Sequence, residues 1–321
     1  MDAMTVLVAG GTGFVGSHLV AKLSGAGLRV IVPTRRFEKA KHLIFLPRVE
    51  VVETDLNDAA ACQRLTRKIG AVVNLVGLLH SRQGTPYGPD FAKAHVELPR
   101  QLVAACAANH VQRYLHMSAL GAAADAPSMY LRSKAAGELA ARAHPRVAAT
   151  IFRPSVIFGP EDKFLNLFAA MQAYLPVLPL AGADTRFQPV YVEDVASAFV
   201  HALADPQTRR QTYELAGPKV YSLAQIVQLA GAFSGHRRPI IKLGPGLARL
   251  QALMLEHLPG GPLMSRDNLD SMKVDNVLAP QSAALTAHAL GIEPTPLEAV
   301  LHHYLGPLLP RFDQYRGRAG R

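Results

Sequence analysis

The sequence predicts an α/β protein, a Rossmann-type doubly wound parallel sheet with a smaller, mostly helical C-terminal lobe. Three observations predict this fold. Apolar runs alternate with helical patterns through the first half of the chain, a glycine-rich turn over residues 10–16 joins the first run to the first helical pattern, and the runs lack strict in–out alternation. Strands that helices cover on both faces have this third property.

Each expected strand of the first half is a short run of apolar and β-branched residues. In chain order these strands are Thr5–Ala9, Arg29–Val32, Val49–Glu53, Ala71–Val76, Arg113–Met117 and Ala148–Phe152. Helical periodicity fills the intervals, and Gly25 and Gly27 follow the first helix as breakers. The expected helices are Val15–Leu23, Ala59–Lys68, Phe91–Ala108 and Met129–Ala143.

The second half is richer in proline and glycine. Its expected helices are Phe164–Tyr174, Val192–Leu203, Leu223–Phe233, Leu247–Leu258 and Pro296–Tyr304. Residues 164–183 carry no charge, but Pro176 and Pro179 would break a membrane-spanning helix, so we expect a buried helix and then a loop. We assign 1–158 to a dinucleotide-binding domain with 187–204 packing back onto it, 159–186 and 205–310 to the smaller lobe, and 311–321 to a basic tail.

Composition and charge limit the class of protein. The 321 residues are 49% hydrophobic and 18% charged, which allows a large core and argues against disorder. The formal net charge of +10 suits anionic partners. The sequence shows no basic run interleaved with aromatic residues and no spacing of a DNA-binding motif, so we expect no nucleic-acid partner. We identify no signal peptide, so we expect a cytoplasmic location, either free or peripheral on the inner face of the membrane. The two cysteines, Cys62 and Cys106, are expected to be reduced core thiols.

The glycine-rich turn predicts a dinucleotide site. Gly10 would permit the tight turn, Gly13 would let the backbone approach a diphosphate, and Gly16 would allow close packing of helix on strand. The spacing Gly-x-x-Gly-x-x-Gly resembles the extended short-chain dehydrogenase/reductase superfamily, which contains epimerases and dehydratases. The whole turn is expected to line the cofactor: Gly10, Gly11, Thr12, Gly13, Phe14, Val15 and Gly16.

The end of the second strand selects the cofactor. An NAD enzyme usually places an acid there, but Thr34 is followed by Arg35 and Arg36. Two guanidinium groups could hold a 2′-phosphate, which favours NADP(H) and leaves NAD(H) open; the alternative is two solvated surface arginines. The resemblance places further cofactor contacts after the third and fourth strands, at Asp55, Leu56, Val76 and Gly77, although Asp55 also fits a helix cap.

The candidate catalytic residues follow the fifth strand. Tyr130 and Lys134 lie four residues apart on a helix and match the Tyr-x-x-x-Lys of the superfamily. The ammonium is expected to lower the pKa of the tyrosine, which could exchange a proton with substrate while hydride moves, and Lys134 could also bind the nicotinamide ribose. The alternative is an ordinary exposed pair. Ser118 is the candidate third member, but an alignment shifted by one residue puts Ala119 there.

Three further segments narrow the resemblance. They are the run from Phe152 through Arg153, Pro154 and Ser155 to Asn166, the run from Gln188 to Ala196, and the run from Leu290 to Leu297. Together they resemble the family of the dinucleotide-binding accessory subunit of respiratory complex I, alpha-subcomplex subunit 9, with its bacterial relatives. The resemblance implies NADPH binding, Pro154 and Ser155 at the nicotinamide end, and either a respiratory complex at the membrane surface or ubiquinone synthesis as the setting.

Three functions stay open. The first is an NADP(H)-dependent oxidoreductase that acts on an unidentified small molecule through Tyr130, Lys134 and Ser118. The second is a non-catalytic dinucleotide-binding structural or assembly factor, and the third is a nucleotide-sugar epimerase or dehydratase. The apolar stripe Leu247, Leu250, Met254 and Leu258 could contact lipid or a partner protein, but core packing is the favoured interpretation.

Overall fold

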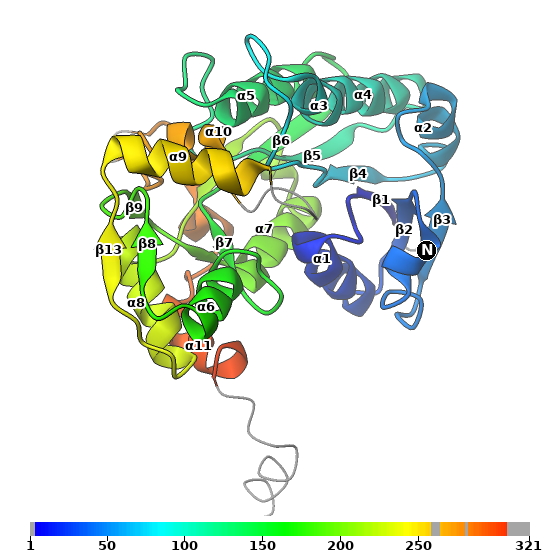
Figure 1. The fold of residues 1–321 in the computed structure, drawn as a ribbon. Coiled ribbons are helices and arrows are strands. Elements are labelled where there is room, and N and C mark those ends of the chain that lie inside the picture. The colour runs from blue at the N-terminus through cyan, green and yellow to red at the C-terminus, as the bar shows by residue number, and fades with distance from the viewer. Residues whose placement is uncertain (1–3, 258–263, 280–281, 307–321) are drawn as a thin grey trace, which may run out of the picture.

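The computed structural model describes residues 4–257, 264–279 and 282–306, so the expected tail 311–321 lies outside the described residues (Figure 1). A parallel eight-stranded sheet forms the centre, in the order β3-β2-β1-β4-β5-β6-β11-β14. The strand order reverses between β1 and β4, which is the switch point of a doubly wound sheet. The predicted fold class is therefore confirmed. The strands are β1 (Thr5–Ala9), β2 (Arg29–Thr34), β3 (Val49–Glu53), β4 (Ala71–Asn74), β5 (Arg113–Met117), β6 (Ala148–Pro154), β11 (Thr212–Leu215) and β14 (Leu285–Thr286).

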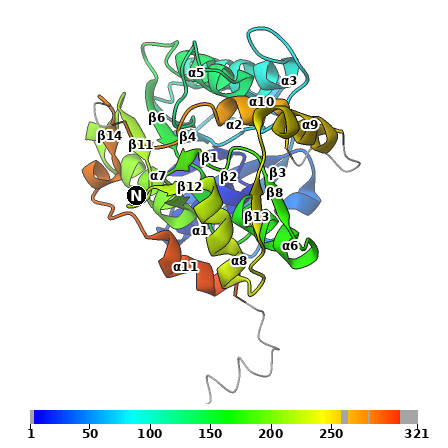
Figure 2. The same ribbon diagram turned by 60° about the vertical axis from the view of Figure 1, so that its left-hand side comes forward.

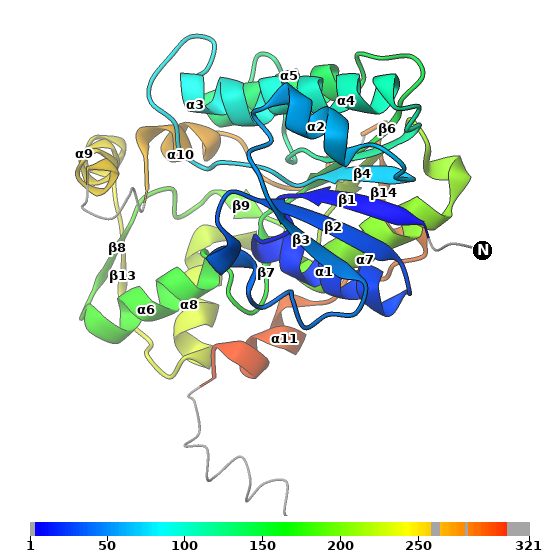
Figure 3. The ribbon, with the colours of Figure 1, turned by 90° about the vertical axis from the view of Figure 1, so that its right-hand side faces the viewer.

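Helices cover both faces of this sheet (Figure 3). On one face lie α1 (Phe14–Gly25) and α7 (Val192–Ala204), and on the other lie α2 (Ala59–Leu65), α4 (Leu98–Ala108) and α5 (Met129–Ala141). Along β1, Val6 and Val8 pack into the first apolar layer, whereas Leu7 and Ala9 pack into the second. Both sets of side chains are buried, which explains why the sequence shows continuous apolar runs.

The helix expected over residues 91–108 is not regular. It consists of α3 (Pro89–Phe91), a π-helical turn (Ala92–Glu97) and α4. Pro99 has no amide hydrogen to donate to the carbonyl of His95, four residues earlier, and its ring would clash with that carbonyl in a regular helix. A wider turn relieves both conflicts. Gly137 lets α5 approach this turn closely, since a Cβ added there would overlap the carbonyl oxygen of His95.

A separate apolar cluster, apart from the two layers on the sheet, forms the core of the smaller lobe. There α6 (Leu165–Tyr174), α8 (Leu223–Phe233) and α11 (Leu297–Tyr304) pack together (Figures 1 and 2). The chain that follows α6 was expected to be a loop but contains strand β8 (Leu178–Leu180). Two short strands from the range 205–310, β11 and β14, join the large sheet beside β6. The remaining strands are β7 (Ile157–Phe158) with β10 (Val190–Tyr191), β9 (Arg186–Phe187) with β12 (Tyr221–Ser222), and β13 (Ile240–Lys242) with β8. The remaining helices are α9 (Pro245–Glu256), α10 (Arg266–Ser271) and three short 3-10 turns, Phe37–Ala40, Pro206–Thr208 and Ala287–Leu290.

The apolar stripe on α9 is not core. The exposed fractions of Leu247, Leu250 and Met254 are 62%, 48% and 63%, so the favoured interpretation of core packing is wrong; Leu258 lies outside the described residues. The residues that α9 buries are Ala248 and Ala252. Across the three described ranges, no helix has both the length and the hydropathy to cross a membrane. Cys62 and Cys106 are buried and unpaired, as expected.

Candidate dinucleotide and active site

The glycine turn lies between β1 and α1, at the carboxyl end of the sheet beside the switch point. Gly10 has a φ of +82°, and a Cβ added at Gly16 would overlap the carbonyl oxygen of Gly10. Gly13 is exposed at the N-cap of α1, with no side-chain cap and no acidic residue in the first helical turn. The backbone amides at the positive end of this helix are therefore placed to accept an anionic group. This geometry fits the diphosphate of a dinucleotide.

The chain after β2 presents two exposed cations. Thr34 is buried, and its hydroxyl donates to the carbonyl of Arg36 at 3.0 Å, which fixes the turn. Arg35 and Arg36 are exposed, and in residues 4–257, 264–279 and 282–306 no carboxylate lies within 4 Å of either guanidinium. Two unpaired guanidinium groups at this point remain available to an anion.

Asp55 follows β3 and lies near this basic turn. Hydrogen bonds from Asn57 lower the pKa of its carboxyl, and the charges of Arg35 and Lys93 act in the same direction. Asp55 is exposed, whereas the side chain of Leu56 is buried in the second apolar layer. Of the two, only Asp55 has a side chain that a ligand could reach.

The chain that follows β4 passes close to Lys134. The amide of Val76 donates to Asn74 Oδ1 at 3.1 Å, and Gly77 is exposed. A Cβ added at Gly77 would lie 3.2 Å from Lys134 Nζ. The fourth strand and helix α5 therefore bring together two residues that the sequence assigned separately to the cofactor and to catalysis.

Burial controls the protonation of the Tyr130–Lys134 pair. Lys134 Nζ lies 5.8 Å from the centre of the Tyr130 ring and donates to the carbonyl of Met117 at 3.2 Å. Burial lowers the pKa of Lys134 to about 8, against the opposing charge of Glu138, and raises the pKa of Tyr130 to about 12. The expected lowering of the tyrosine pKa is therefore wrong, because desolvation outweighs the ammonium. Tyr130 is a phenol at neutral pH, which suits a proton donor.

Ser118 belongs to a buried ion-pair network. Its hydroxyl donates to Glu138 Oε1 at 2.6 Å, and Arg153 binds both oxygens of the same carboxylate at 2.7 and 2.8 Å. Ala119, by contrast, belongs to the small apolar cluster against which Tyr130 packs. Ala119 therefore lies nearer to Tyr130 in the packing, while the hydroxyl of Ser118 is engaged by Glu138.

Pro154 ends β6, and Ser155, which follows it, is tied to the smaller lobe. Its hydroxyl donates to Asn276 Oδ1 at 2.6 Å, and the amide of Val156 donates to the same oxygen at 3.0 Å. Ser155 is buried, so its hydroxyl serves the contact between sheet and lobe. A cofactor contact at Ser155 would therefore involve its backbone and not its hydroxyl.

Sequence reasoning missed His95, whose ring links the Gly77 loop to α5. Leu78 donates its amide hydrogen to His95 Nε2 at 2.9 Å, so Nε2 carries no proton. Nδ1 then donates to Ser133 Oγ at 2.8 Å, and Ser133 donates to the carbonyl of Tyr130 at 2.7 Å. Burial, with smaller effects from Lys134 and His116, lowers the pKa of His95 to about 2 and keeps it neutral. This chain fixes Leu78 relative to Tyr130.

Asp267, on α10, was also missed. One carboxylate oxygen accepts from the amide of Met129 at 2.6 Å, and the other accepts from the amide of Tyr130 at 3.0 Å. Ser128 accepts from Leu131 in the same turn. The first turn of α5 is thus capped by a residue 137 positions further along the chain than Tyr130. A lone acid in a polar segment gives no signal of such a contact.

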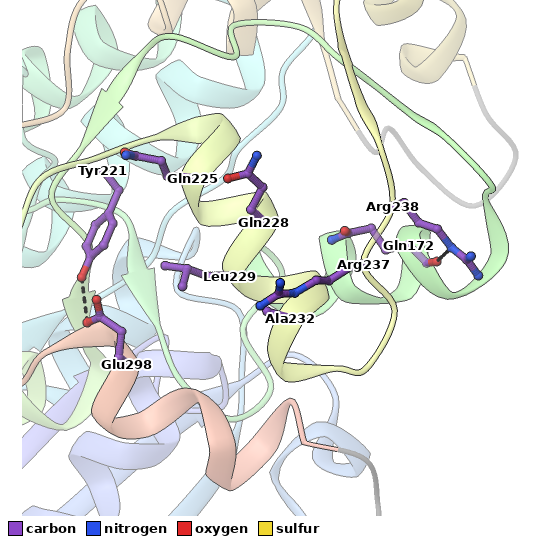
Figure 4. A pocket seen from close by; sticks show the side chains of 9 residues that line it. All are labelled: Gln172, Tyr221, Gln225, Gln228, Leu229, Ala232, Arg237, Arg238 and Glu298. Atoms are coloured by element: carbon purple, nitrogen blue, oxygen red, sulfur yellow. Dashed lines mark hydrogen bonds between the residues drawn. The ribbon is translucent and has the colours of Figure 1, made fainter.

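A separate recess of about 620 Å³ lies on the smaller lobe, lined by α8 and the segments around it (Figure 4). Arg238 donates to the carbonyl of Gln172 at 2.9 Å, and Tyr221 donates to Glu298 at 2.8 Å. None of the predicted site residues lines this recess. In the part of the chain that the structure describes, no three His, Cys, Asp or Glu side chains converge as a metal site would require.

Comparison with known proteins agrees with this geometry. Residues 6–216 match the family described as the NAD dependent epimerase/dehydratase family. Mouse (Mus musculus) NADH dehydrogenase [ubiquinone] 1 alpha subcomplex subunit 9, mitochondrial, is 32% identical over 93% of this chain and 78% of the relative. A ceramide reductase of Caulobacter vibrioides is 32% identical over 78% of this chain and 77% of the relative. These matches confirm the resemblance inferred from the sequence.

Solved structures confirm the fold. The structure titled "MoeE5 in complex with UDP-glucuronic acid and NAD" superposes with a TM-score of 0.73 over 94% of this chain and 97% of the other, at 20% identity. With the family match, this supports the predicted binding of a nicotinamide dinucleotide.

Proposed function

This chain belongs to the NAD dependent epimerase/dehydratase family, and from that membership we propose that it is an NADP(H)-dependent oxidoreductase of the short-chain type. The observation that carries the proposal is the meeting of Gly77, on the cofactor side, with Lys134 Nζ on the catalytic side. The name of one relative, ceramide reductase, supports reduction as the reaction. The substrate is an unidentified small molecule with a reducible group.

The residues present fit a nicotinamide dinucleotide. Gly10 and Gly16 allow the tight packing of the turn against strand and helix, and the exposed Gly13 at the uncapped end of α1 leaves its backbone amides open to the diphosphate. Arg35 and Arg36 would hold the 2′-phosphate of NADP(H), and Lys134 would bind the nicotinamide ribose. When bound, the reduced nicotinamide supplies hydride.

The protein supplies the proton and the position of the substrate. For a carbonyl substrate, the carbonyl carbon gains hydride, and Tyr130 Oη donates its proton to the oxygen, which gives an alcohol. Lys134, as an ammonium below pH 8, stabilises the negative charge that then develops on the tyrosine. His95 and Asp267 hold the Gly77 loop and the first turn of α5 in register while this occurs.

Titration calorimetry tests cofactor choice. The wild-type protein should bind NADPH at least 10-fold more tightly than NADH, and the double variant Arg35→Ala, Arg36→Ala should lose this preference. Arg67→Ala, another exposed arginine, is the matched control and should keep it. An unchanged preference in the double variant would remove the proposed 2′-phosphate site.

A test of catalysis uses Tyr130→Phe with NADPH oxidation as the readout against ketones and quinones. Turnover should fall at least 100-fold while NADPH binding changes little. Full activity in this variant would refute the assigned role of Tyr130.

The second candidate is a non-catalytic dinucleotide-binding subunit or assembly factor of a respiratory complex. The alanine at position 119 and the name of the mouse relative favour it. Tight NADPH binding without turnover, together with copurification with respiratory subunits, would support this function. The third candidate, nucleotide-sugar epimerisation or dehydration, would require turnover of a UDP- or dTDP-sugar with bound NAD.

A further inference from the structure

Helix α9 presents its large apolar side chains outward. Leu247, Leu250, Leu253 and Met254 are 62%, 48%, 40% and 63% exposed, whereas the side chains it buries are those of Ala248 and Ala252. At about 100° of rotation per residue, the four large side chains fall within one arc of about 120°. An isolated exposed leucine is ordinary, but a continuous apolar arc on one helix marks a contact surface.

The helix is held in place by residues outside this arc. Gln251 Nε2 donates to the carbonyl of Pro179 at 3.0 Å, and Glu256 pairs with Arg266 of α10 at 2.9 Å. In Figures 1 and 3 it lies along the outer edge of the smaller lobe, over the end of the β8–β13 pair. Its outward arc, which we call the α9 face (Leu247, Leu250, Leu253 and Met254), therefore has a fixed orientation.

Unpaired arginine lies beside the α9 face. Arg249 is exposed at the margin of the arc, next to Leu253 by helical rotation. Of the six Lys or Arg in residues 236–273, Lys242, Arg266 and Lys273 pair with Asp184, Glu256 and Asp270. The other three, Arg237, Arg238 and Arg249, form no ion pair within the described residues, in a chain of net charge +10. Apolar side chains flanked by arginine on a helix that lies flat are typical of a helix that inserts at the boundary between lipid headgroups and acyl chains.

From these observations we propose that the α9 face docks on an anionic lipid bilayer. Leu247, Leu250, Leu253 and Met254 enter the headgroup boundary, and Arg249 contacts lipid phosphates. The 12 residues of α9 span roughly 18 Å, so the helix lies on the bilayer and does not cross it. A protein partner or a second copy of this chain would cover the same arc but would give different results in the test below.

Vesicle flotation with the full-length protein tests this surface independently of enzymatic activity. Vesicles of phosphatidylcholine with 30% phosphatidylglycerol should bind the protein at least 10-fold more strongly than phosphatidylcholine alone. Leu247→Glu with Met254→Glu should abolish flotation, and Arg249→Glu should weaken it several-fold. Leu139→Glu is the matched control, because Leu139 is 71% exposed but lies on α5. It should float like the wild type.

Light scattering and thermal melting complete the experiment. Unchanged melting of the double variant would show that its loss of flotation comes from the surface and not from unfolding. The proposal is overturned if the wild type does not bind the anionic vesicles, or if Leu139→Glu loses binding as fully as the double variant. It is also overturned if the wild type is a dimer that the double variant dissociates while vesicle binding is absent.

Discussion

Asp267→Ala is the substitution with the most distinctive expected result, since Asp267 joins the smaller lobe to the first turn of the helix that carries Tyr130. Removing the carboxylate leaves the amides of Met129 and Tyr130 without their acceptors at 2.6 and 3.0 Å. A hydrogen bond to a charged group contributes about 1.5–3 kcal/mol. Burial raises the pKa of Asp267, which shows that the carboxylate also has a desolvation cost, and this cost disappears in the variant. We expect a net loss of about 2–3 kcal/mol of unfolding free energy.

Urea unfolding monitored by circular dichroism measures this loss. Asp267→Asn keeps one neutral acceptor and should lose about half as much. The control, Asp184→Ala, removes an exposed ion pair with Lys242 and should change stability by less than about 0.5 kcal/mol. If Asp267→Ala stays within about 0.5 kcal/mol of wild type, the cap does not stabilise α5 and the reasoning is refuted.

Three other substitutions give further expected outcomes. Gly16→Ala places a methyl group against the carbonyl oxygen of Gly10, so NADPH affinity should fall at least 10-fold by calorimetry; wild-type affinity would contradict the described turn. If Lys134 acts as an ammonium of pKa about 8, kcat/KM for reduction should be level below pH 7 and decline above pH 8. Lys134→Arg should extend the level region to higher pH. A decline at the same pH in that variant would exclude Lys134 as the group that titrates. Ser118→Ala should lower stability by about 1–2 kcal/mol through Glu138 and leave kcat nearly unchanged in the folded protein, whereas a 100-fold loss of kcat with stability intact would show that Ser118 is catalytic.

Elements whose pattern is complete within a short stretch of sequence were predicted correctly. The strands at Thr5–Ala9, Val49–Glu53 and Arg113–Met117 have the predicted bounds, since each is a short run with turn signals on either side. The glycine turn was predictable for the same reason, because its strand and helix are immediate neighbours. β11 was missed, because its four residues include Glu214 and its pairing partner β6 lies about 60 residues earlier.

The parts of the site that sequence could not give depend on contacts between distant residues. Asp267 caps a helix 137 residues away, and His95 bonds to Ser133, 38 residues away. The direction of the Tyr130 pKa depends on how deeply the fold buries the ring, which the spacing to Lys134 does not encode. For α9, periodicity identified the apolar stripe but could not show that the alanine side faces the protein.

The path of the chain between the large sheet and the smaller lobe limits how this protein can diversify. After β6 the chain enters the lobe, returns for α7 and β11, leaves again for α8 to α10, and returns once more for β14 before α11. No single cut separates the two parts, so recombination cannot exchange the lobe as a cassette, as it can in enzymes whose second domain is appended at one end. New specificity in this architecture therefore has to arise by changes within the interleaved segments and not by replacing the lobe as a whole.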